Sequence, residues 1–149
     1  MKKHKPTPLF PGDVAIKSIE RGVFDLKLEP EHASITGINW HVAPAWRFPP
    51  ASIEVECRID IRAYPASGAL RDLPMLHMEL FTTFVVPHLE DDKYSDRIIL
   101  HPLFLSLFAE TALSTARGII TARCLGTVIE KFPIPYRDGD AAAPPSLEE

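Results

Sequence analysis

The chain contains few cysteines and few glycines. Its two cysteines, Cys57 and Cys124, lie far apart, form no CxxC motif and have no cluster of histidines beside them. This spacing argues against a disulfide scaffold and a structural zinc site, and indicates two small buried side chains. The seven glycines form no phosphate-binding loop, and the six histidines include no i, i+4 helical pair. No metal or cofactor is therefore predicted.

The sequence also lacks an excess of positive charge and a long apolar run. Sixteen Lys and Arg residues stand against 20 Asp and Glu, a formal charge of −4, so non-specific nucleic-acid binding is not expected. The longest apolar run, 98–113, contains His101, Pro102 and Glu110 and is too short and polar to span a membrane. No apolar stretch of signal-peptide length stands near the N-terminus. These absences predict a cytoplasmic protein.

What is present fits one globular domain. The 149 residues are 46% hydrophobic and 24% charged, close to the average of soluble domains. The N-terminal residues are basic and rich in proline, and the C-terminal GDAAAPPSLEE combines small, proline and acidic residues that bury little surface. We therefore predict a flexible segment 1–12, a single domain 13–138 and a disordered tail 139–149.

Three stretches carry the pattern of β-strands. Apolar and charged residues alternate over 53–64, which predicts a strand with one buried and one solvent-exposed face. A second strand is predicted over 75–86, where apolar residues on the second face suggest that something covers part of it. Residues 14–28 predict either one bent strand with a bulge near Arg21 and Gly22 or two short strands.

The remaining stretches are an irregular segment and a helix. Residues 30–50 hold both tryptophans and four prolines without a regular period, which predicts an ordered crossover or an irregular extended segment. From Pro102 to about Gly126 the period becomes helical, with proline suited to the first turn and glycine to the stop. Strands followed by one long helix predict an α+β fold, with a helix on one face of an antiparallel sheet.

Glu110 is the strongest candidate for a catalytic residue. Its helical setting resembles the helix of hot-dog thioesterases, where a carboxylate can activate water as a general base. That fold continues with several strands after its helix, and almost none can follow here. Glu110 also shares a helical stripe with Arg117, which favours a solvated or paired surface charge. A small thioesterase or hydrolase that uses Glu110 is the alternative to a non-catalytic protein.

Several large apolar side chains have no place in these regular patterns. They lie in the 30–50 segment, on the second face of the 75–86 strand and beside the polar stripe of the helix. Either they form a second small core, or they line an apolar groove or an oligomer surface. They are Trp40, Val42, Trp46, Phe48, Met75, Phe81, Val85, Leu103 and Leu107.

At the helix the sequence resembles the SecB family of protein-export chaperones and its SecB-like relatives. In that family a helix with a small-and-aliphatic face runs to a glycine and then to a proline-marked extended segment. The resemblance covers 13–137 loosely and 102–135 specifically, and the second C-terminal helix of the family has no counterpart. The matching residues are Phe108-Ala109-Glu110, Ser114-Thr115-Ala116-Arg117-Gly118-Ile119-Ile120, Gly126-Thr127 and Phe132-Pro133-Ile134-Pro135.

The resemblance implies a four-stranded antiparallel sheet with one long helix, in dimers that assemble into tetramers. It also implies a holdase without a cofactor, which binds unfolded or extended polypeptides in apolar grooves. The export motor would be a further partner, and another system such as a toxin–antitoxin pair is an alternative setting. The groove residues implied are Trp40, Val42, Trp46, Phe48 and Phe81. The residues expected at an oligomer interface are Leu103, Leu107, Ala109, Ala112 and Ala116.

Overall fold

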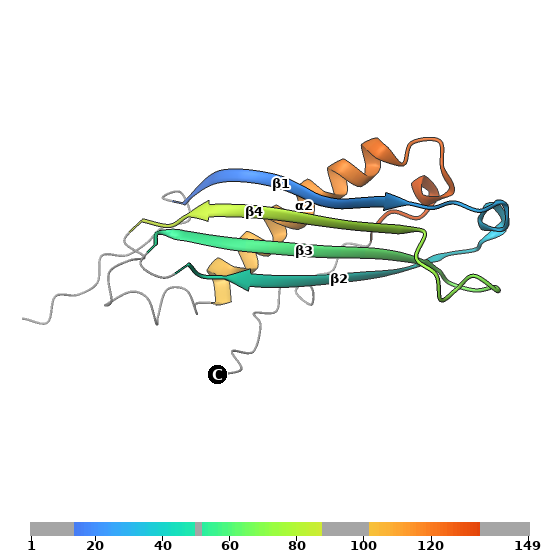
Figure 1. Cartoon of the computed structure of the whole chain (residues 1–149), viewed down its shortest axis with the longest axis horizontal. Helices are drawn as coiled ribbons and strands as arrows, with labels where there is room; N and C mark the ends of the chain where they lie inside the picture. Colours follow the sequence, from blue (N-terminus) through green and yellow to red (C-terminus); the bar gives the residue numbers. More distant parts are fainter. Residues whose placement is uncertain (1–13, 50–51, 88–101, 135–149) are drawn as a thin grey trace, which may run out of the picture.

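The computed structural model describes residues 14–49, 52–87 and 102–134 (Figure 1), so the predicted segments 1–12 and 139–149 lie outside the described residues. Its four strands form one antiparallel sheet in the order β1-β4-β3-β2. Helix α2 crosses one face of this sheet, which confirms the predicted α+β class. The elements are β1 (Ala15–Leu26), η2 (Pro30–Ser34), β2 (Ile38–Arg47), β3 (Glu54–Pro65), β4 (Leu76–Val85), α2 (Pro102–Arg123) and the short 3-10 helix η3 (Val128–Lys131).

The two central strands, β3 and β4, hold the core. Their inward side chains alternate with outward ones along the whole strand, as the period of two predicts. Neighbouring strands flank them on both sides and α2 covers them, so Ile59, Ile61, Met78 and Leu80 are buried. Strand β4 begins and ends one residue inside the predicted range 75–86.

Strand β2 corrects the prediction of an irregular segment over 30–50. After the short helix η2, the chain forms a regular ten-residue strand that pairs with β3 from Ile38 to Arg47. The inward side chains of β2 are at even positions, Trp40 and Trp46 among them. Pro44 lies in the middle of this strand, opposite Ile59. An edge strand tolerates a proline because part of its row of N–H groups faces solvent, and the prolines hid the alternation.

Strand β1 forms the opposite edge and is a single irregular strand, the first of the two predicted alternatives. Its pairing with β4 shifts between Ile16 and Ser18 and again between Arg21 and Phe24. The second shift includes Gly22, where a Cβ would lie only 2.8 Å from Cε2 of Phe81. Glycine is therefore required for the ring of β4 to lie against the backbone of β1.

Helix α2 starts at Pro102 as predicted and ends at Arg123, three residues before Gly126. Its buried face packs on the sheet, and Phe108 stacks on Phe84 with ring centroids 4.4 Å apart. The alanines of this face are also buried, and their small size lets the helix approach the strands closely. Among the described residues, no helix combines the length and apolar character needed to cross a membrane.

Candidate functional site

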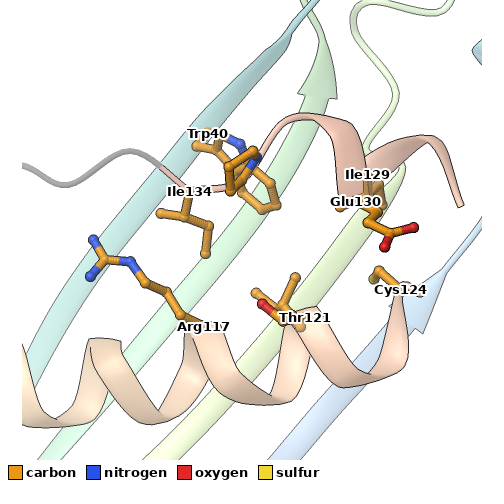
Figure 2. A pocket seen from close by; sticks show the side chains of 9 residues that line it. Trp40, Arg117, Thr121, Cys124, Ile129, Glu130 and Ile134 are labelled. Carbon is orange, nitrogen blue, oxygen red and sulfur yellow. The ribbon is translucent and has the colours of Figure 1, made fainter. Parts of the chain in front are cut away.

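An apolar hollow lies beside the C-terminal half of α2, with η3 and strand β2 on its other sides (Figure 2). Its cavity volume is about 140 Å³, below the roughly 300–1,000 Å³ of sites that enclose drug-sized ligands. Three of its lining residues are polar or charged, Arg117, Thr121 and Glu130. The six others are Trp40, Ile120, Cys124, Ile129, Pro133 and Ile134.

The turn after α2 builds one wall of the hollow. Gly126 has a φ of +78°, a left-handed conformation that suits glycine and stops a helix. The Thr127 hydroxyl donates to the carbonyl of Cys124 at 2.7 Å, and the Gly126 N–H donates to Glu130 Oε2 at 2.9 Å. These bonds close the turn and direct η3 back along the helix.

A hydrogen bond from Trp40 holds the last described segment against the sheet. Its indole Nε1 donates to the carbonyl oxygen of Phe132 at 3.1 Å. The ring is 8% exposed and lies next to Ile134 in Figure 2. Because a buried indole N–H needs an acceptor, this bond fixes both the ring and the extended segment at 132–134. The contact that defines the hollow thus joins two segments that lie 92 positions apart in the sequence.

The charged groups of the hollow have opposite signs and lie apart. Figure 2 shows Arg117 at one end of the hollow and Glu130 at the other. Between them the lining is apolar except for Thr121, and it includes Cys124, whose thiol pKa is raised by burial. The second free thiol, Cys57, lies inside the sheet, where burial raises its pKa to about 12. Both thiols therefore stay protonated and act as apolar groups.

The structure brings only one of the predicted groove residues to this hollow. Trp40 lines it, whereas Val42, Trp46 and Phe48 are half-buried against the core along the same strand face. The Trp46 ring lies 6.4 Å from the Phe108 ring, centroid to centroid. Phe81 points to the opposite face of the sheet, where it lies against Gly22 rather than near the tryptophans.

Sequence reasoning missed the other walls of the hollow, Ile120, Ile129 and Ile134. A signal for them was present, since Gly126-Thr127 and the proline-marked segment at 132–135 indicate a turn after the helix. That turn does not reveal which strand the following segment reaches.

The predicted interface residues of the helix are largely used inside the chain. Ala109, Ala112 and Ala116 are buried under the sheet, the last two completely. Leu107 is half-buried, and the side chain of Leu103 lies outside the described residues. An interface on α2 would therefore have to use the outer side of the helix.

Glu110 lies on the exposed side of α2, seven residues before Arg117. Seven residues correspond to about 10 Å along a helix, and Glu110 does not line the hollow. A general base has to reach the proton of a bound substrate. Glu110 is exposed and lies outside the hollow that the described residues form.

Among residues 14–49, 52–87 and 102–134, the face of the sheet opposite α2 is uncovered, and it carries a compact charge cluster. His77 Nε2 lies 3.1 Å from Asp60 Oδ2 and 4.0 Å from Glu79 Oε1. This geometry could hold a metal ion, but each carboxylate already contacts an arginine. Arg58 bonds to Glu79 at 2.6 Å and Arg62 to Asp60 at 3.3 Å, so the cluster has the form of an ion-pair network.

No family model matches the chain, and no curated protein matches its sequence. Among solved structures, it is similar to the Mycobacterium tuberculosis Rv1957 SecB-like chaperone in complex with a ChAD peptide from the Rv1956 HigA1 antitoxin. The sequence identity is 15%, the match covers 85% of this chain and 87% of that chain, and the TM-score is 0.39. A likeness of this size carries no argument about what this chain binds.

Proposed function

We propose that this chain is a non-catalytic, SecB-like holdase that binds unfolded or extended polypeptides. The observation that carries the proposal is the apolar hollow between α2, η3 and β2, with six apolar lining residues and no enclosed catalytic group among its described residues. The resemblance of 102–135 to the SecB family supports the same reading. The proposal includes a cytoplasmic location, with protein export or a system such as a toxin–antitoxin pair as its setting.

The mechanism follows from the lining. A client inserts an apolar side chain into the hollow, and burial stabilises the complex by roughly 25 cal/mol per Å² of apolar surface removed from water. Arg117 and Glu130 stay at the rim, where they can meet polar or charged neighbours of that side chain. Because apolar burial is not directional, such a site accepts many sequences and needs no nucleotide.

The proposal also includes self-association into homodimers or homotetramers. Strand β1 supports it, because this edge of the sheet leaves three large aliphatic side chains exposed. They are Ile16, Ile19 and Val23, between 41 and 47% exposed. A row of unpaired backbone groups with exposed aliphatic side chains is a surface on which another strand can pair.

The decisive variant is Thr121→Trp, because Thr121 is exposed on α2 and lines the hollow. An indole there fills the space without removing a core contact. We expect the affinity for an unfolded, aggregation-prone client to fall about tenfold, a change of about 1.4 kcal/mol. Fluorescence anisotropy of a labelled unfolded client measures this, and suppression of its aggregation is a second readout.

Ser114→Trp is the matched control, since Ser114 is exposed on the same helix and does not line the hollow. Its client affinity should equal that of the unmodified chain. If a folded Thr121→Trp variant and the Ser114→Trp control bind the client with equal affinity, the hollow is not part of the client site. A client that binds neither variant nor the unmodified chain would count against the holdase itself.

A further inference from the structure

We infer that the hollow is also a docking site for the C-terminal segment of this chain, with Leu147 as the anchoring side chain. The segment would then compete with clients, and this consequence depends on the proposed function. The contact itself can be measured without any client.

Chain connectivity brings the segment to the hollow. Residues 135–149 lie outside the described residues and follow Ile134, which lines the hollow. Leu147 is thirteen positions after Ile134, and an extended chain spans roughly 3.3 Å per position, or about 43 Å in all. The segment is therefore long enough to turn back onto the site that it leaves.

The composition of the segment singles out one anchor. Residues 137–149 read RDGDAAAPPSLEE, in which Leu147 is the single large apolar residue. The hollow offers mainly aliphatic and aromatic groups to such a side chain. Tyr136, the other large side chain of the segment, follows Ile134 by only two positions, so Leu147 is the apolar side chain with enough chain before it to turn back into the hollow.

Charge favours the same arrangement. Residues 137–149 contain four carboxylates and one arginine, and Glu148 and Glu149 directly follow Leu147. With Leu147 in the hollow, these two carboxylates can lie at the Arg117 end, away from Glu130. Carboxylate and guanidinium attract each other most strongly where the surroundings exclude water.

Covalent attachment makes a weak contact effective. A tethered segment meets its site at an effective concentration on the order of millimolar. Even a contact with a millimolar dissociation constant would then fill the hollow about half of the time. Clients that bind more tightly would displace the segment, so it would act as a threshold against weak clients.

The experiment uses the full chain and the fluorescence of Trp40, which lines the hollow. Trp46, the other tryptophan, does not line it and contributes a constant background. We compare acrylamide quenching of the unmodified chain with that of Leu147→Asp. If the segment covers Trp40, the quenching constant should rise about twofold in Leu147→Asp, and a synthetic DAAAPPSLEE peptide added in excess should lower it again.

Ala142→Asp is the control, because it adds the same charge to the segment and keeps Leu147. Its quenching should equal that of the unmodified chain. Equal quenching of Leu147→Asp and Ala142→Asp would overturn the inference. A separate titration with an unfolded client reports on the proposed function alone: Leu147→Asp should bind two- to fivefold more tightly, while higher quenching without any client binding would leave the docking intact and refute the holdase.

Discussion

Trp40 and Phe81 show that the neighbours of an aromatic residue decide its role. Both are large rings of one sheet. Trp40, on β2, lies on the side that the helix covers, and Phe81, on β4, lies on the opposite side. The Phe81 ring covers the backbone of Gly22 on the next strand, a packing in which an aromatic residue compensates for the missing side chain of a glycine. We therefore expect Phe81 to stabilise the sheet rather than to contact clients.

Phe81→Ala tests this role. The loss of the ring uncovers Gly22, so the free energy of unfolding should fall by about 1 kcal/mol, the size of a good cross-strand pair. Client affinity should stay unchanged. Urea denaturation followed by circular dichroism measures the first, and anisotropy measures the second. A variant with unchanged stability but lower client affinity would show that Phe81 belongs to the client-binding surface.

Asp60, on the face of the sheet opposite α2, contacts His77, Arg58 and Arg62. Partial burial by itself would raise its pKa, but the hydrogen bond and charge of His77, together with those of Arg62, outweigh burial. The pKa of Asp60 therefore lies below its ordinary value of 3.8. A carboxyl group with a lowered pKa stabilises the folded chain above its unfolded pKa and loses this contribution as the pH falls through the folded pKa.

Asp60→Asn should accordingly destabilise the chain most at pH values above about 4. The difference in unfolding free energy between the unmodified chain and this variant should shrink as the pH falls below 3.8. Urea melts at a series of pH values measure it, with Glu110→Gln as the control for the loss of one exposed carboxylate. A difference that stays constant down to the lowest pH would show that the ion pairs of Asp60 contribute nothing.

At the scale of elements, the two edges of the sheet differ in what they offer to another strand. Strand β2 carries Pro44 in its middle, and a proline cannot donate a backbone hydrogen bond. Strand β1 has no proline and exposes Ile16, Ile19 and Val23. Natural proteins protect sheet edges with proline, charge and bulges. Strand β2 has the proline, and β1 has charged residues and two register shifts, so the exposed aliphatic side chains are what favour β1 for the proposed self-association.

A double variant, Ile19→Lys with Val23→Lys, should weaken this self-association. Two added positive charges on each β1 edge repel those of a second copy, and the aliphatic contact is lost. We expect the dissociation constant to rise at least about tenfold, measured by light scattering across a concentration series. Leu73→Lys is the control, because Leu73 is 60% exposed in the β3–β4 connection. An unchanged oligomer in the double variant would exclude β1 as the interface.

At the scale of the whole molecule, local sequence patterns predicted the helix and strands better than the contacts between them. The alternation over 53–64 and the helical period after Pro102 each follow from residues close in sequence, and both elements form as predicted. Strand β2 was missed because Pro44 and its flanking prolines mask the alternation, and only the edge position of the strand makes a proline acceptable there.

The hollow depends on contacts that no local pattern contains. Trp40 and Phe132 are 92 positions apart. Helix α2 ends beside Phe24 of β1, and the segment after η3 reaches back to Trp40 on the edge strand β2. Trp40, Trp46 and Phe81 carry the same aromatic signal, but of the three only Trp40 lines the hollow. Which rings share a cavity is decided by strand order, and strand order is a property of the complete fold.

The unequal edges also limit how large an assembly can become. If two copies joined through β1, as proposed, the combined sheet would end on both sides at a β2 strand that carries Pro44. Such a two-fold contact closes on itself, whereas a head-to-tail contact between unlike borders would propagate into a fibre. In such a dimer the missing N–H of Pro44 would oppose the addition of a further strand at β2.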